Sequence, residues 1–129
     1  MARKLVSNHS PYLFIDFTID LIDRTISQEK AEALVDTGFT GDLSVPPQIV
    51  RNGKTPVPDL YANLTLANGS KARVPVYEGT VVFRELEGEI AQPIDVSVFI
   101  LGDEVLVGRS LMDHFRVTLD HGKQIIVEP

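Results

Sequence analysis

The sequence predicts an all-β domain, a closed barrel or a sandwich, on three observations. Hydrophobic residues recur with a period of two, as in Asp16–Leu21, because successive side chains of a strand point to opposite faces. Asn68-Gly69 stands between two apolar runs, and this dipeptide is the strongest short signal for a β-hairpin. A helical pattern occurs only late and briefly, at Ser110–Phe115.

The strands can be placed in order along the chain. After Asp16–Leu21, a polar loop at Asp23–Glu29 is expected to lead into a second strand, Ala31–Asp36. Pro46-Pro47 ends the next strand and suits the start of a short helical turn. The remaining expected strands are Asp42–Val45, Leu60–Ala67, Ser70–Tyr77, Thr80–Leu86, Ile94–Leu101, Val105–Gly108, Arg116–Asp120 and Gln124–Glu128. No βαβ rhythm interrupts this series, so a parallel α/β fold is not expected.

Length and composition narrow the possible function classes. The chain has 129 residues and a net charge of -6, which indicates a single domain over residues 1–129 without the basic stripe of a nucleic-acid-binding protein. It has no cysteine, and His9, His114 and His121 lack the close spacing of a zinc site, so no metal or cofactor is expected. No apolar segment is long enough for a signal or a membrane span, and the expected location is the cytoplasm.

One carboxylate stands in an unusual setting, in the stretch ALVDTGFTG. Asp36 follows the apolar residues Leu34-Val35, so it is expected where a buried strand emerges into a turn. Gly38 and Gly41 allow the backbone there to approach another chain or a ligand closely. Taken alone, Asp-Thr-Gly is more often a structural turn than a catalytic site, since all three residue types favour turns.

The context of this stretch resembles one known family. Ala33–Pro46 is similar to the active-site strand and loop of retropepsin-like aspartic proteases, especially small single-domain bacterial members. The second signature of that family, apolar residues, a glycine and a short helix, has its counterpart in VLVGRSLMDHF, Val105–Phe115. The hairpin Leu64–Val74 lies between the two, where the family has its substrate-covering flap. The resemblance implies the acid-protease fold, a closed β-barrel with one short C-terminal helix and a β-hairpin flap.

The resemblance also implies roles for particular residues. Asp36, Thr37 and Gly38 would be the catalytic triplet, with Thr37 bonding across a dimer. Contacts with substrate are expected from the loop and the flap, and support for the active-site loop from the second signature. These residues are Phe39, Thr40, Ala67, Asn68, Gly69 and Ser70 for substrate, and Leu106, Val107 and Gly108 for support.

A single Asp-Thr-Gly has a further consequence. Aspartic proteolysis needs two adjacent carboxyls that share one proton, and this chain is too short for a second lobe. The hypothesis therefore requires a homodimer in which Asp36 of each copy meets at a two-fold axis, with a peptide or protein as substrate. Residues 1–11 are expected to form an arm that is either flexible or in contact with the dimer partner. The alternatives are a non-catalytic β-barrel dimer that binds peptide or serves in assembly, and a monomer inactive until partnered.

Overall fold

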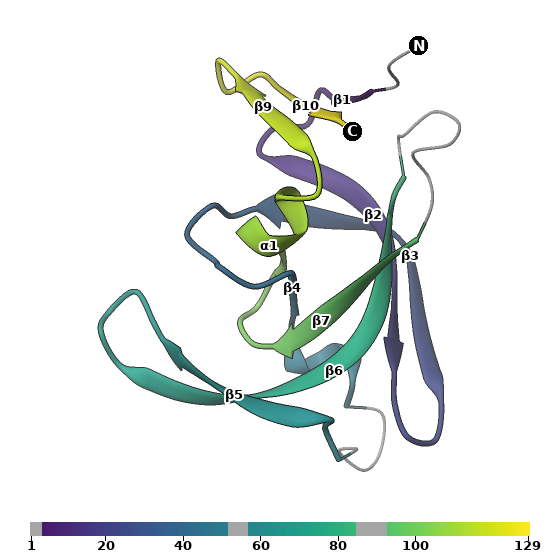
Figure 1. The fold of residues 1–129 in the computed structure, drawn as a ribbon, viewed down its shortest axis with the longest axis vertical. Coiled ribbons are helices and arrows are strands. Elements are labelled where there is room, and N and C mark those ends of the chain that lie inside the picture. Colours follow the sequence, from purple (N-terminus) through teal and green to yellow (C-terminus); the bar gives the residue numbers. More distant parts are fainter. Residues whose placement is uncertain (1–3, 52–56, 85–92) are drawn as a thin grey trace.

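The computed structural model describes residues 4–51, 57–84 and 93–129. Strands make up most of this part of the chain, with one 3₁₀ turn at Pro47–Ile49 and one short helix, α1, at Arg109–Met112 (Figure 1). The strands are β1 (Leu5–Ser7), β2 (Tyr12–Asp20), β3 (Thr25–Val35), β4 (Leu43–Val45), β5 (Leu60–Thr65), β6 (Lys71–Phe83), β7 (Ile94–Ile100), β8 (Val105–Val107), β9 (Arg116–Asp120) and β10 (Gln124–Glu128).

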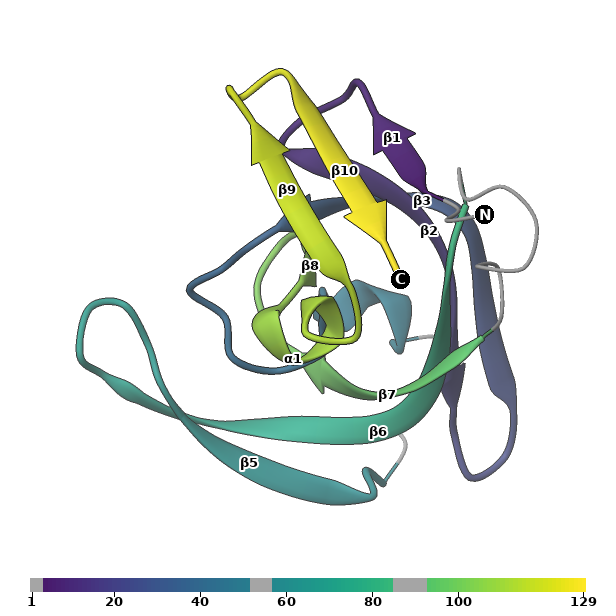
Figure 2. The same cartoon turned by 45° about the horizontal axis from the view of Figure 1, so that its top comes forward.

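Six strands close into a barrel. Their hydrogen-bonded order is β2-β3-β8-β4-β7-β6, and β6 pairs again with β2, which completes the ring. β5 pairs only with β6 within the described chain and runs with it beyond the ring as a hairpin (Figure 2). The all-β prediction is therefore confirmed, and the architecture is a closed barrel rather than a sandwich.

The period-two pattern fills this barrel. Along β2, the side chains of Leu13, Ile15, Phe17 and Ile19 point inward and are at most 1% exposed. Full burial of such a side chain contributes about 1.5–3 kcal/mol to folding. The same core cluster includes residues of α1, β1 and β10, so these elements pack onto one core with the barrel.

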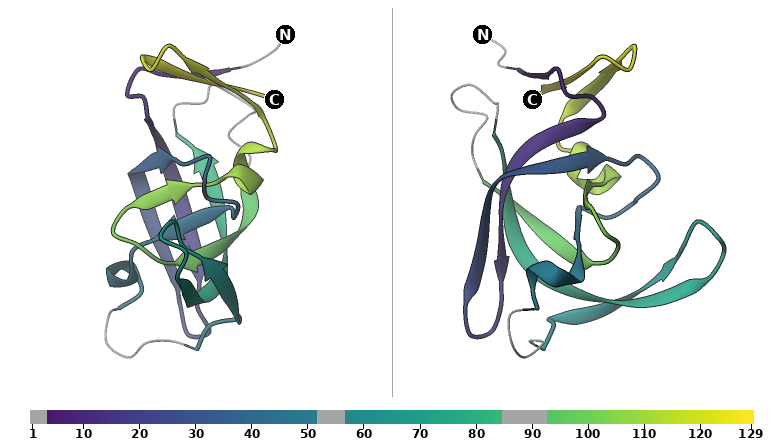
Figure 3. Two further views of the ribbon diagram at one scale, coloured as in Figure 1. Left: turned by 90° about the vertical axis from the view of Figure 1, so that its left-hand side faces the viewer. Right: turned by 180° about the vertical axis from the view of Figure 1, so that it is seen from behind.

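A second sheet covers one end of the barrel. Its order is β1-β10-β9, all antiparallel, with Leu5 opposite Val127. Leu5 is 1% exposed and Ser7 is fully buried, and the Ser7 hydroxyl donates to the carbonyl of Tyr12 (2.8 Å). β1 and the C-terminus lie at this end of the molecule (Figure 3). Residues 5–7 of the expected N-terminal arm are thus a strand in the sheet of their own chain.

The prediction of a loop at Asp23–Glu29 is wrong, because β3 already begins at Thr25. Thr25 pairs with Asp20, so β2 and β3 form a long hairpin. Most side chains at the start of β3 are exposed to solvent, and their polarity therefore marks an exposed strand rather than a loop.

The two strands predicted at Ser70–Tyr77 and Thr80–Leu86 are a single strand, β6, up to Phe83. Residues 85 and 86 lie outside the described residues. Gly79 does not break β6, since it is buried at the crossing with β2. A Cβ at this position would lie 2.0 Å from the carbonyl oxygen of Thr18, so only glycine permits the two backbones to approach this closely.

The predicted helix at Ser110–Phe115 is displaced and shortened to Arg109–Met112. The chain turns directly after Met112, where the N–H of Phe115 donates to the Met112 carbonyl (2.9 Å), and enters β9 at Arg116. No helix in residues 4–51, 57–84 or 93–129 has the length and apolar character needed to cross a membrane.

The crossing at Gly79 yields a stability prediction. We expect Gly79→Ala to lower the free energy of unfolding by about 1–3 kcal/mol, because the added methyl group forces β2 and β6 apart. Chemical denaturation measures this loss. Ser97→Ala, an exposed position on β7, is the control and should stay within about 0.5 kcal/mol of the parent protein. Equal stability of the two variants would contradict the close approach.

Candidate active site

Asp36 stands at the first residue after β3, held by main-chain bonds. Its N–H donates to the carbonyl of Val107 in β8 (2.9 Å), and its own carbonyl accepts the N–H of Phe39 (3.2 Å). The side-chain Oδ1 accepts the N–H of Gly38 (2.9 Å). The other carboxylate oxygen, Oδ2, accepts no hydrogen bond within the described part of the chain, and the side chain is half-buried. One oxygen therefore orders the turn, while the other is available to a second group.

β8, the barrel strand next to β3, supports this position. It runs parallel to β3, with Leu106 opposite Leu34 and Val107 opposite Val35, and antiparallel to β4 on its other side. β4 in turn pairs in parallel with β7. The two parallel pairs depart from the purely antiparallel sheet that short strands and hairpins favour. Because β8 lies between β3 and β4, it fixes both ends of the loop that carries Asp36.

Main-chain donors at the start of α1 bind the carbonyl groups of that loop. A helix begins with N–H groups that have no partner inside the helix, and here the loop supplies the acceptors. Ser110 adds a side-chain donor, its hydroxyl group. The bonds run from the Gly108 N–H to the Asp42 carbonyl (2.8 Å), the Arg109 N–H to the Phe39 carbonyl (2.8 Å), the Ser110 N–H to the Gly41 carbonyl (3.2 Å), and the Ser110 hydroxyl to the Thr40 carbonyl (2.6 Å).

These bonds require a glycine at position 108. A Cβ there would lie 2.1 Å from the Gly41 carbonyl oxygen and 2.6 Å from the ring of Phe39. The apolar-apolar-Gly pattern thus has a steric cause, because the loop passes directly over this residue. The sequence pattern predicted the supporting roles of Leu106, Val107 and Gly108 but not that of Ser110. A hydroxyl residue shortly after the glycine, at the start of the predicted helix, was the signal that could have indicated it.

The ring of Phe39 lies against the barrel. It stands edge-on to the ring of Phe99 on β7, with centroids 5.4 Å apart and an interplanar angle of 89°. Thr37, Gly38 and Thr40 are exposed on the surface beside it. Thr37 also lines a shallow cavity of about 250 Å³ with residues of α1 and β9, among them Met112, Phe115 and Leu119.

The hairpin of β5 and β6 carries the residues predicted to cover a substrate. Gly69 has φ = 84°, and its N–H donates to the Leu66 carbonyl (2.9 Å), while the Leu66 N–H donates to the Ser70 carbonyl (2.7 Å). Asn68 Oδ1 accepts both the N–H (2.9 Å) and the hydroxyl (2.6 Å) of Ser70. Asn68 itself has no positive φ, so the turn is the three-residue type in which glycine alone takes the left-handed conformation.

The hairpin tip and the loop after β3 project from the same side of the barrel (Figures 1 and 3). Ala67, Asn68, Gly69 and Ser70 are all exposed. No described hydrogen bond or ring contact joins them to the Asp36 loop, so the tip is held only by its own turn and by the pairing of β5 with β6.

A tyrosine–glutamate pair lies at the start of β2 and directly before β8. The Tyr12 hydroxyl donates to Glu104 Oε1 (3.3 Å). The negative charge of Glu104 raises the pKa of Tyr12 above its ordinary value, because it disfavours a second negative charge on the phenol oxygen. Tyr12 therefore remains a neutral donor at physiological pH.

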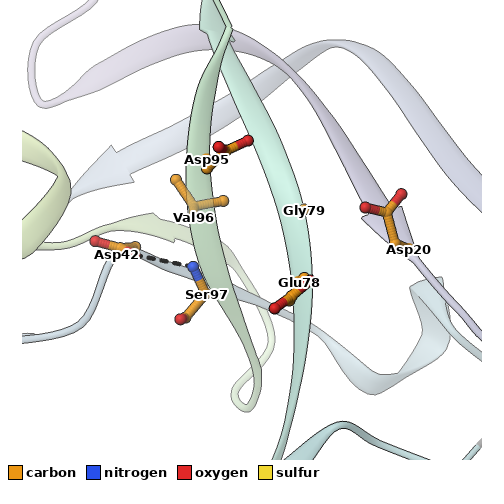
Figure 4. Close-up of a pocket in the computed structure, with 7 residues that line it drawn as sticks. All are labelled: Asp20, Asp42, Glu78, Gly79, Asp95, Val96 and Ser97. Atoms are coloured by element: carbon orange, nitrogen blue, oxygen red, sulfur yellow. Dashed lines mark hydrogen bonds between the residues drawn. The ribbon is translucent and has the colours of Figure 1, made fainter.

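An acidic cavity of about 370 Å³ lies elsewhere, over β6 and β7. Figure 4 shows the carboxylates around it, one of which, Asp42, accepts the main-chain N–H of Ser97 (2.9 Å). Its lining residues are Asp20, Asp42, Glu78, Gly79, Asp95, Val96 and Ser97. Within residues 4–51, 57–84 and 93–129, no three His, Asp or Glu side chains are arranged to hold a metal ion.

Comparison with known proteins bears on the fold. No protein-family model matches the chain, and no curated protein matches it. A solved structure that does match is the crystal structure of a retropepsin-like aspartic protease from Rickettsia conorii, with a TM-score of 0.57 over 97% of this chain and 88% of that chain. The chain has the retropepsin-like fold. The sequence identity is 17%, so this likeness shows the fold only.

The contact at Gly108 yields a second prediction. We expect Gly108→Ala to displace the loop that carries Asp36, because a methyl group cannot share space with the Gly41 carbonyl oxygen. Its free energy of unfolding should fall by about 1–3 kcal/mol, as for other overpacked positions. Ser110→Ala, which removes only the bond to Thr40, should cost about 1 kcal/mol. Denaturation curves that rank the two variants in the opposite order would contradict this account of the glycine.

Proposed function

We propose that this protein is an aspartic endopeptidase of the retropepsin-like family. The observation that carries the proposal is the setting of Asp36, a half-buried carboxylate at the end of a barrel strand with Oδ1 bonded to Gly38 and Oδ2 without a partner in the described chain. An ordinary turn explains the bond to Oδ1. The main-chain bonds from the start of α1, which order the whole loop, go beyond what a turn needs and support a role for the carboxylate.

The reaction requires a second carboxylate. Two carboxyls about 3 Å apart cannot both ionise, so a pair shares one proton. The ionised member takes a proton from a water molecule that attacks the peptide carbonyl carbon. The protonated member donates a hydrogen bond to the carbonyl oxygen and stabilises the negative charge that develops there. The second carboxylate in this proposal is Asp36 of another copy, related by a two-fold axis.

The other predicted residues have roles in the same scheme. The exposed Thr37 would donate a hydrogen bond to the partner's loop, and Gly38 would allow the two backbones to pack at the axis. Ala67, Asn68, Gly69 and Ser70 at the hairpin tip would close over an extended peptide, exclude water and offer main-chain hydrogen bonds. The exposure of the tip and its projection on the side of the Asp36 loop support this role (Figure 3).

A surface for the second copy is available next to Thr37. The edge of β9 opposite β10 has no strand partner within the described chain, and an unpaired edge can accept another strand. Leu119 on β9 is 56% exposed and lines the same shallow cavity as Thr37. Burial of Leu119 and the other apolar side chains of this cavity against a second copy would stabilise a dimer. The interface of such a dimer would continue into the proposed active site.

A non-catalytic dimer that binds peptide or serves in assembly is the second candidate. The exposed hairpin and the free edge of β9 suit this function equally well. The ordered carboxylate favours the enzyme, since a binding module does not need an acid with one unpaired oxygen at this position.

Substitution of the carboxylate tests the enzyme. Asp36→Asn should lower the rate of cleavage of a peptide library by at least about a hundredfold, because an amide can neither activate water nor share the proton. The dimer should persist in sedimentation velocity, and the free energy of unfolding should change little. Cleavage at the parental rate by the variant would rule out the catalytic role of Asp36.

Dilution and a surface substitution test the dimer. Activity per molecule should fall as the protein is diluted below the dissociation constant of the dimer. Leu119→Lys should shift this fall to higher concentration by at least about tenfold, because it places a charge in the proposed interface. Ile22→Lys is the matched control, since Ile22 is 86% exposed on the β2–β3 turn. If activity per molecule is independent of concentration in the parent protein and in both variants, a site shared between two copies is contradicted.

A further inference from the structure

The ring of Phe39 occupies the space left by two missing side chains. A Cβ at Gly41 would lie 2.6 Å from Cζ of this ring, and a Cβ at Gly108 would lie 2.6 Å from its Cδ2. The ring of Phe99 closes the third side, edge-on. The retropepsin-like resemblance predicted that Phe39 contacts substrate, but these contacts point the ring at the body of the barrel.

The main chain of Phe39 is bonded on both sides to the machinery around Asp36. Its N–H donates to the Asp36 carbonyl (3.2 Å), and its own carbonyl accepts the N–H of Arg109 (2.8 Å). A shift of the ring is therefore passed directly to the backbone that precedes and follows it. The turn between Asp36 and Phe39 also contains Gly38, whose N–H holds the carboxylate oxygen.

We propose that Phe39 is a positioning residue for the Asp36 carboxylate: its ring, wedged over Gly41 and Gly108 against Phe99, sets the height and direction of the loop from which the carboxylate extends. The inference rests on the proposed function, because two carboxyls that share a proton must meet within hydrogen-bonding distance. A displacement of about 1 Å from such a geometry can cost on the order of a hundredfold in rate.

The proposal explains why two glycines and two aromatic residues occur together. A smaller residue at position 39 leaves part of the space over these glycines empty, since neither glycine can supply atoms to fill it. A larger side chain at position 41 would meet two rings at once, Phe39 at 2.6 Å and Phe99 at 2.7 Å. The four residues thus form one packing unit, and its member nearest to Asp36 in sequence is Phe39, whose N–H donates to the Asp36 carbonyl.

The experiment compares Phe39→Leu with Phe83→Leu. Leucine at position 39 retains atoms near Gly108 but does not reach Gly41 or Phe99. Phe83 is buried and stands edge-on to Phe115, with centroids 5.2 Å apart, so the control loses the same kind of contact outside the Asp36 loop. For each variant, kcat and KM are measured on one cleaved peptide. Amide hydrogen exchange is followed over residues 36–42 by mass spectrometry.

We expect Phe39→Leu to lower kcat by at least about tenfold with KM within about twofold of the parent, and to speed exchange over residues 36–42. Phe83→Leu should leave kcat within about twofold and exchange over 36–42 unchanged. Phe99→Leu should lower kcat and speed exchange in the same way as Phe39→Leu. The fold-loss of kcat in the double variant should be smaller than the product of the two single fold-losses, because both substitutions remove the same contact between the rings.

Other results would overturn the inference. A raised KM with unchanged kcat would make the ring a substrate contact, and equal losses of kcat in Phe39→Leu and Phe83→Leu would reduce it to general packing. Unchanged exchange over 36–42 in Phe39→Leu would show that the ring does not order the loop. The last readout needs no activity, so it separates failure of this inference from failure of the proposed function, which Asp36→Asn tests independently.

Discussion

The binding of loop carbonyl groups by the start of α1 is the interaction on which the rest of the site depends. The N–H groups of Gly108, Arg109 and Ser110 satisfy carbonyls of the loop after β3 that would otherwise need water or another partner. Only glycine at position 108 allows the loop to come this close. Two segments about seventy residues apart in sequence thereby become one rigid unit, and Asp36 takes its position from both.

The closed barrel supports that unit on several sides, whereas the β5–β6 hairpin extends beyond the ring. β3, β8 and β4 belong to a ring that β6 and β2 complete, so none of them can shift without disturbing the core. The described hydrogen bonds at the tip of the β5–β6 hairpin all lie within its own turn. Regions with few buried contacts open most easily, and the proposed cover over a substrate would use this property.

In the proposed function, the single carboxylate would link chemistry to assembly. An aspartic peptidase needs two carboxyls, and the Asp-Thr-Gly of one chain supplies one. β10 lies between β1 and β9, so both edges of β10 are already satisfied within the chain, and the edge of β9 beside α1 is the one that remains near the Asp36 loop. Assembly and catalysis would therefore be controlled by the same face of the molecule.

The sequence by itself determined the all-β fold, the hairpin at Asn68-Gly69 and the position of Asp36 at the end of a strand, because alternation, turn residues and local chemistry are short-range signals. Only the tertiary structure decided that β3 begins at Thr25, that β6 continues through Gly79, and that Phe39 faces the barrel. Each of these depends on a contact with a segment distant in sequence: Thr25 on its pairing with Asp20, Gly79 on the backbone of β2, and Phe39 on Gly108 and Phe99. A residue type limits the local conformations and contacts that are available, and contact with a distant segment determines which of them is adopted.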